Sequence, residues 1–199
     1  MVSFAAQERS ALHGFALPGR HGAGTAGLLI EERTDLSFAS VIAKRGKRDQ
    51  LVSAVETAYG VALPKGPRRV TRGSVTFAGT GPDQWIASAE GAEAQNFAAR
   101  VRGRIGLFAA VSDQTVARLA LRLSGPKVRD VLAKGVPLDL HPKVFKPGDV
   151  ATTLVAYIGV QIDRIDETFQ LTAPRSMAGS FWSWLSASAA EFGYDVVTR

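Results

Sequence analysis

The chain of 199 residues contains no cysteine and only three histidines. The absence of cysteine excludes disulfides, cysteine-ligated zinc, iron–sulfur clusters and thiol catalysis. His13, His21 and His141 are far apart, and none has a second histidine or a carboxylate at a metal-ligand spacing such as His-Glu-x-x-His. The sequence therefore predicts no metal site contributed by this chain alone.

Long apolar runs are missing as well. No stretch of 18 consecutive apolar residues is present, and Glu8 and Arg9 follow a short, weakly apolar N-terminal stretch. We therefore expect neither a membrane span nor a secretory signal, and we expect a cytoplasmic protein. With 46% hydrophobic and 21% charged residues, the composition is that of an ordinary globular protein.

The net charge of +6 is concentrated in the N-terminal half. Residues 1–104 hold 14 Lys and Arg against 9 acids, whereas residues 105–199 hold 10 against 9. Three clusters supply this charge: Lys44-Arg45-Gly46-Lys47-Arg48, the segment 65–72, and the segment 100–104. Such clusters can contact phosphates, anionic ligands or an acidic protein surface, although short basic turns are commonly only solvated. Because no aromatic residues are interleaved with them, nucleic-acid binding is a minor alternative.

The order of predicted elements repeats. In the first half, the patterns predict strands over 37–44, 74–78, 84–89 and 107–111, and helices over 48–59 and 92–103. In the second half, a strand over 116–123 precedes a short helix with Ser124 as N-cap and Gly135 as stop. One strand over 151–166, another over 169–173, a long helix and a strand over 194–197 follow. Each half thus resembles the split β-α-β unit of ferredoxin-like folds.

The predicted fold is therefore α+β, with two similar ferredoxin-like halves packed into one unit. We expect an N-terminal arm over 1–27, a first half over 28–112 and a second half over 113–199. The connection near 112–115 is too short to be a flexible linker.

One apparent nucleotide motif is discounted. Gly22-Ala-Gly-Thr-Ala-Gly27 matches Gly-x-Gly-x-x-Gly, but this fingerprint works only between a strand and a helix. Here the preceding segment 17–21 is not strand-like, and the following segment 28–33 looks like a strand. We interpret residues 1–27 as a flexible or docking arm.

Catalytic constellations are also missing. No nucleophile elbow or Ser/His/Asp set is visible, and Asp163 and Asp166 are expected on a solvated face. His141 is the best polar candidate for function, because two prolines and Gly148 shape its loop. A structural role for this histidine is the simpler interpretation.

The segment 175–193 predicts a C-terminal helix that begins at the N-cap Ser176 and ends at Gly193. Its apolar face consists of Met177, Phe181, Trp184, Leu185, Ser188 and Phe192. Trp182 and Ala189 widen this face beyond one stripe, which is typical of a helix covered from two sides, although a wide helix within one domain remains an alternative.

Three blocks resemble the gamma subunit of heterotetrameric sarcosine oxidase over most of residues 28–193. They are Ser124-Gly-Pro-Lys-Val-Arg-Asp-Val-Leu132, then Asp139-Leu-His-Pro142 with Phe145-Lys-Pro-Gly-Asp149, and Arg175-Ser-x-Ala-x-Ser-Phe-Trp-x-Trp-Leu185 with Ala189-Ala-Glu-Phe-Gly193. The segment 1–27 matches only loosely. The turn 166–169 lacks a proline that we expect from the family.

The resemblance implies a non-catalytic subunit in a complex of alpha, beta, gamma and delta chains that oxidatively demethylates sarcosine to glycine with oxygen and folate. It also implies that FAD, FMN, NAD and tetrahydrofolate belong to the larger chains and zinc to the small one. The family is similar to the folate-binding domain of the glycine cleavage T-protein, but a shared fold does not imply a shared function.

We therefore expect no catalytic, cofactor-binding or metal-binding residue here. Phe181, Trp184 and Leu185 are expected to pack on the chain's own sheet. The expected partner interface consists of Arg175, Trp182, His141, Lys44, Arg45, Lys47 and Arg48. A stand-alone folate-binding protein of the T-protein superfamily and a basic nucleic-acid-binding module are the alternatives.

Overall fold

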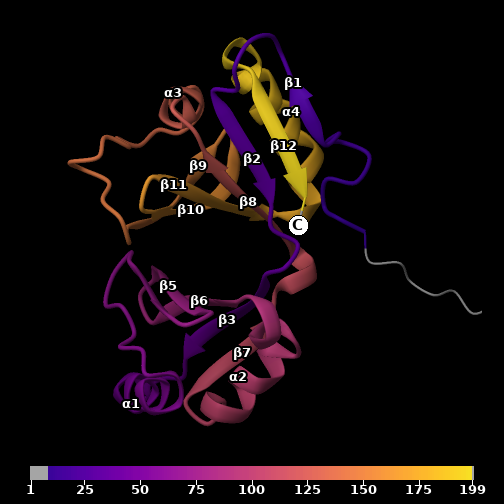
Figure 1. Ribbon diagram of the computed structural model, residues 1–199. Coiled ribbons are helices and arrows are strands. Elements are labelled where there is room, and N and C mark those ends of the chain that lie inside the picture. Colours follow the sequence, from indigo (N-terminus) through magenta and orange to yellow (C-terminus); the bar gives the residue numbers. More distant parts are fainter. Residues whose placement is uncertain (1–8, 199) are drawn as a thin grey trace, which may run out of the picture.

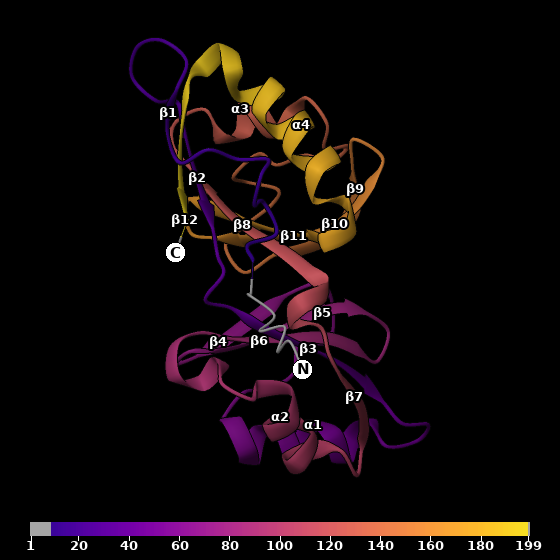
Figure 2. The same cartoon turned by 90° about the vertical axis from the view of Figure 1, so that its right-hand side faces the viewer.

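The computed structural model of the protein describes residues 9–198. It shows a mixed α+β structure with one seven-stranded and one five-stranded sheet. The two sheets belong to two lobes that lie one above the other, and each lobe carries helices on the side away from the other lobe (Figures 1 and 2).

The five-stranded sheet is antiparallel and has the order β4-β5-β6-β3-β7. Its elements are β3 (Ser37–Ala43), α1 (Arg48–Tyr59), β4 (Arg69–Arg72), β5 (Val75–Gly81), β6 (Gln84–Ala89), the 3-10 turn η1 (Gly91–Ala94), α2 (Phe97–Ile105) and β7 (Ala109–Asp113). The helices α1 and α2 cover one face of this sheet, where Leu51, Phe77 and Val101 are fully buried.

The seven-stranded sheet has the order β1-β12-β2-β8-β11-β10-β9. Its strands are β1 (Gly19–His21), β2 (Leu28–Glu32), β8 (Arg118–Ser124), β9 (Val150–Val155), β10 (Ile158–Ile165), β11 (Thr168–Pro174) and β12 (Tyr194–Thr198). Its helical elements are η2 (Thr115–Ala117), α3 (Val128–Ala133), η3 (Arg175–Met177), α4 (Ala178–Ala189) and η4 (Ala190–Phe192). The helices α3 and α4 cover its outer face, over Leu121, Ile162 and Phe169.

Local patterns predicted most elements well. The helix over 48–59 and its left-handed stop at Gly60 are confirmed, as is a strand from Ser37. Two N-cap predictions are wrong, because Ser124 is the last residue of β8 and Ser176 lies inside the 3-10 turn that precedes α4. No helix among residues 9–198 is long and apolar enough to cross a membrane.

The N-terminal segment is more integrated than an arm. Leu12 is buried in the core under α4, β1 pairs with β12, and β2 is inserted between β12 and β8. The glycine-rich segment connects β1 to β2, so the strand predicted after it is confirmed, whereas the prediction that residues 17–21 hold no strand is wrong. Residues 28–32, which we assigned to the first half, therefore complete the sheet of the second half.

The two sheets face each other through polar side chains. In β10, Ile158, Val160 and Ile162 point to the helix-covered core, so Gln161 and Asp163 point toward the other sheet. The expectation that Asp163 lies on a solvated face is wrong: it is 3% exposed, because the second sheet covers this face. Gln161 Nε2 donates a 2.7 Å hydrogen bond to Asp163 Oδ1.

Polar contacts also join the lobes at their margins. The buried Arg33 guanidinium, at the end of β2, donates bidentately to Asp35 and also to Glu90, which follows β6. The hydrogen bonds that Arg33 donates to Asp35 and Glu90 raise the pKa of Arg33 above its usual value. On the other side, Arg68 pairs with Asp149, and Arg69 N donates to Gly148 O at 2.8 Å.

The face predicted for α4 is confirmed at Phe181, Leu185 and Ser188, which are buried, but the predicted outward orientation of Trp182 is wrong. Trp182 is only 8% exposed and lies in the chain's own core, where its ring meets Tyr194 edge-on at 6.2 Å. Trp184 is the half-exposed tryptophan, and it lies against Gly135, whose added Cβ would stand 2.6 Å from the indole nitrogen. Met177 is exposed. The expected outward orientation of Trp182 is thus corrected.

The burial of Asp163 predicts a pH dependence of folding stability. Desolvation raises its pKa from 3.8 to about 6, although the hydrogen bond from Gln161 and the charge of Arg69 oppose this. Because the folded pKa exceeds the unfolded one, the ionised carboxylate costs stability, and this cost develops as the pH rises from about 4 to about 6.

The free energy of unfolding of Asp163→Asn should therefore exceed that of the native chain by more at pH 8 than at pH 4, and the difference should be up to about 3 kcal/mol. Urea unfolding at a series of pH values measures this difference. Asp166→Asn, at an exposed carboxylate just beyond the same strand, is the control and should show no comparable gain. Equal pH profiles for native chain and Asp163→Asn would contradict the prediction.

The different burial of the two tryptophans of α4 predicts that their truncation lowers the free energy of unfolding by unequal amounts. Trp182→Ala leaves a cavity in a closed core and should lower the free energy of unfolding by about 3 to 5 kcal/mol. Trp184→Ala removes a half-exposed ring and should cost less, about 1 to 2 kcal/mol. Denaturant unfolding of both full-length variants measures the two losses of unfolding free energy. A larger loss for Trp184→Ala would contradict the assignment of Trp182 to the core.

Candidate partner interface

The described residues gather no catalytic or metal-binding constellation. Within residues 9–198, no group of three or more His, Asp or Glu side chains is placed to hold a metal ion. The Gly22–Gly27 segment is not a strand-to-helix turn, because it connects β1 to β2; at its end, Gly27 packs against Phe192 and Lys127. The polar features that remain are surfaces suited to contact another molecule.

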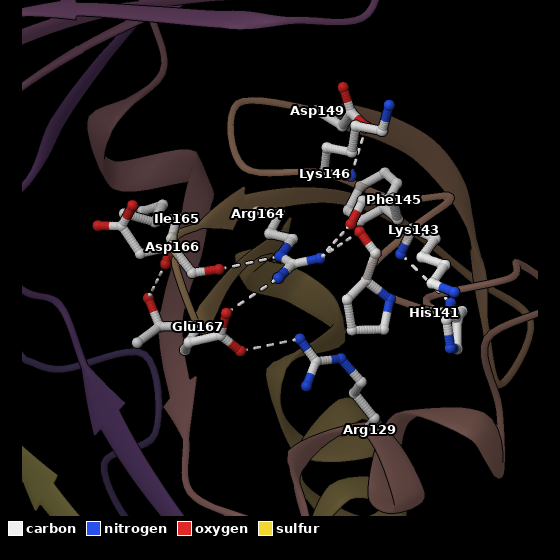
Figure 3. Close-up of polar contacts among 12 residues, drawn as sticks. Arg129, His141, Lys143, Phe145, Lys146, Asp149, Arg164, Ile165, Asp166 and Glu167 are labelled. Carbon is white, nitrogen blue, oxygen red and sulfur yellow. Dashed lines mark hydrogen bonds and ion pairs between the residues drawn. The ribbon is translucent and has the colours of Figure 1, made fainter.

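The first surface is the loop that carries His141, shown in Figure 3. His141 is exposed; its backbone N–H donates to Asp139 Oδ1 at 2.8 Å, and its Nδ1 accepts from Lys143 N at 3.2 Å. The ring is thus oriented by its own loop and remains open to solvent. Among residues 9–198, no carboxylate forms a hydrogen bond with the ring. The ring therefore shapes its own loop through Lys143 N and leaves one edge accessible to solvent.

Arg164 anchors this loop from beneath. Its side chain is 2% exposed, and its guanidinium donates to the carbonyls of Phe145, Pro142 and Asp166 and to Glu167 (Figure 3). A second arginine, Arg129, donates to the other oxygen of Glu167 at 3.1 Å. The hydrogen bond from Arg129 lowers the pKa of Glu167. A buried guanidinium that satisfies several carbonyls fixes the loop in one conformation.

The second surface is the basic turn before α1. Lys44 and Arg48 are engaged within the chain: Lys44 Nζ donates to Gly106 O at 2.7 Å, and Arg48 pairs with Asp83 at 2.8 Å. Arg45 and Lys47 are exposed, and among residues 9–198 neither forms an ion pair. The structure brings this turn close to neither His141 nor Arg175.

The basic segment 100–104 is different, because all three of its arginines bind the chain itself. Arg100 pairs with Glu93, Arg102 donates to Val111 O, and Arg104 donates to Ala58 O while lying 4.9 Å from the centroid of the Tyr59 ring. These contacts tie α2 to its neighbours and leave less free charge than the sequence indicated.

The third surface is a groove between the lobes, which we call the inter-lobe groove. It has a volume of about 540 Å³. The segment 9–11, the end of β2, the start of β3 and residues 115–120 line it, together with Arg175 and Thr198. Arg175, a predicted interface residue, donates to the carbonyls of Arg9 and of Ser10.

Arg118 is the unusual side chain of this groove. It is half-buried, lines the inter-lobe groove and also lines a second cavity of about 410 Å³ between the sheets. Burial lowers its pKa, and no carboxylate offsets this effect. Among residues 9–198, the side chain of Arg118 makes neither a hydrogen bond nor an ion pair. Sequence reasoning missed it, although the alternation Arg118-Leu-Ala-Leu-Arg122 places both arginines on one face of a strand.

Residues 46–191 match the family described as "Sarcosine oxidase, gamma subunit family". The sarcosine oxidase subunit gamma of Corynebacterium sp. (strain P-1) is 35% identical over 151 residues, covering 73% of this chain and 72% of the relative. That of Arthrobacter sp. is 32% identical over 182 residues, covering 87% and 86%.

Solved structures agree. A chain of the heterotetrameric sarcosine oxidase from Corynebacterium sp. U-96, in complex with pyrrole 2-carboxylate, superposes with a TM-score of 0.78 at 25% identity, covering 93% of this chain and 96% of that one. The glycine cleavage system aminomethyltransferase T from Bartonella henselae shares the fold, with a TM-score of 0.64 at 16% identity over 86% of this chain and 48% of that one. The chain belongs to the sarcosine oxidase gamma subunit family.

Proposed function

We propose that this chain is the structural, non-catalytic gamma subunit of a heterotetrameric sarcosine oxidase, the complex that oxidatively demethylates sarcosine to glycine with oxygen and folate. The observation that carries the proposal is the similarity, over 93% of this chain, to a chain of the heterotetrameric enzyme. The family match over residues 46–191 agrees with it. A stand-alone folate-binding protein is less favoured, because the likeness to aminomethyltransferase T concerns the fold.

Its partners are then the alpha, beta and delta subunits, and FAD, FMN, NAD, tetrahydrofolate and zinc belong to them. The chemistry of the described residues supports this division. The chain has no cysteine, and residues 9–198 contain no cluster of three His or carboxylate side chains suited to a metal. The cytoplasmic location stays a prediction.

The interface with these partners includes the predicted residues that are exposed or only partly buried. Arg45 and Lys47 present free positive charge, His141 presents its ring on an anchored loop, and Arg175 lines the inter-lobe groove. Trp182 contributes through packing beneath the surface, since its ring is in the core.

We also infer that the two lobes descend from one split β-α-β plan. The element order β3-α1-β5-β6-α2-β7 of one lobe is repeated as β8-α3-β10-β11-α4-β12 in the other. The strand order β5-β6-β3-β7 in the first sheet corresponds to β10-β11-β8-β12 in the second, where β2 lies between β8 and β12. The inserted strand β2 and the edge strands β1, β4 and β9 are additions to this plan.

Co-purification tests the proposed function. An affinity-tagged full-length chain, produced in the native host, should carry a flavin-containing complex through purification. The same chain produced alone should bind no flavin, NAD or metal in stoichiometric amount and should not oxidise sarcosine. Stoichiometric cofactor in the isolated chain, or a tagged chain that brings down no flavoprotein, would refute the proposal.

The double variant Arg45→Glu/Lys47→Glu tests the basic turn, and it spares Lys44 and Arg48, which have contacts within the chain. Assembly should be slower at low salt and approach the native rate at high salt, because exposed charges steer association and are screened by ions. Lys65→Glu, an exposed reversal outside every predicted interface, is the control and should assemble at close to the native rate. Native assembly rates for the first variant at low salt would show that the turn is merely solvated.

A further inference from the structure

The inter-lobe groove carries uncompensated positive charge. Three arginines line it without an ion pair among residues 9–198: Arg9, Arg118 and Arg175. The groove has one acidic residue, Glu32, and its carboxylate already accepts hydrogen bonds from Ser10 Oγ and Leu12 N. A fourth arginine, Arg33, is neutralised by Asp35 and Glu90. The groove is therefore cationic, and its complementary occupant is an anion.

Arg118 identifies where such an anion would bind. No nitrogen of its guanidinium is fully buried, but half-burial removes part of its hydration and no hydrogen bond within residues 9–198 replaces it, which is unfavourable. A carboxylate is the planar partner that matches its donors bidentately. Because Arg118 lies where the groove meets the second cavity between the sheets, a carboxylate on an extended side chain can reach it from the groove.

The floor of the groove is apolar. Leu36, Phe38 and Ala120 form a small buried cluster with Ile86, and the first three line the groove. At its rim, Val116 is 76% exposed. A surface that combines apolar contacts with unpaired arginines suits a polypeptide segment whose apolar side chain is flanked by acids. A small inorganic anion would use the arginines but leave the exposed side chain of Val116 uncovered.

We infer that the inter-lobe groove is the docking site for an acidic segment of a partner subunit, with Arg118 as the main carboxylate anchor and Arg175 and Arg9 beside it. This inference rests on the proposed function, because it requires a partner. It adds to that function a place on the chain and the chemistry of the segment that binds there.

Charge reversal within the complex tests the anchor. The full-length variants Arg118→Glu and Arg118→Lys are mixed with the remaining subunits, and their affinities are compared with that of the native chain. Arg118→Glu should bind about tenfold or more weakly at low salt, with a smaller deficit at high salt. Arg118→Lys keeps the charge and should retain part of the affinity. Lys65→Glu, an exposed reversal outside the groove, should bind as the native chain does.

Photo-crosslinking identifies the occupant without disturbing Arg118. A benzophenone amino acid at position 116 of the full-length chain should crosslink, in the assembled complex, to a segment of another subunit that contains Asp or Glu. This measurement stands even where Arg118→Glu fails to fold. Crosslinks confined to residues 1–8 of this chain, or to a segment without acids, would overturn the inference, as would native affinity of a folded Arg118→Glu chain.

The two proposals fail in different ways. If the native chain and Arg118→Glu join the flavin-containing complex equally well, the proposed function stands and only the assignment of the groove as a docking site is contradicted. A native chain that joins no such complex overturns both.

Discussion

Two sheets that bury their apolar faces under their own helices meet each other through their polar faces, and this constraint shapes the molecule. One core lies under α1 and α2 and the other under α3 and α4, and among residues 9–198 the apolar contact between the lobes is one small cluster. The contact between the lobes is therefore made of paired polar groups such as Arg33 with Glu90 and Arg68 with Asp149. Where pairing is incomplete, a cationic groove remains around Arg118.

Local sequence patterns predicted what depends on nearest neighbours. The spacing of Leu51 and Val55 and the stop at Gly60 gave α1 its bounds, and alternation in β3 and β8 indicated strands. The lack of cysteine and the scattered histidines led to the prediction that no metal site is built here, which stays a prediction. The three sequence blocks led to the family, and the family match confirmed it.

What the sequence missed depends on partners distant in the chain. Asp163 alternates with apolar residues like any surface strand residue, and only the second sheet makes it buried. The insertion of β2 between β12 and β8 follows from long-range pairing that no local window contains. The orientation of Trp182 was predicted wrongly because the helical pattern does not show that this flank of α4 is covered by Tyr194 of β12.

The most direct test of this account is whether Arg33 couples the lobes. Calorimetry of the full-length native chain should show one unfolding transition. Arg33→Met removes the buried guanidinium that joins the end of β2 to Asp35 and Glu90 while keeping an apolar side chain of similar length. We predict that this variant unfolds in two separated transitions, one for each core. A single transition at the native midpoint would contradict the account.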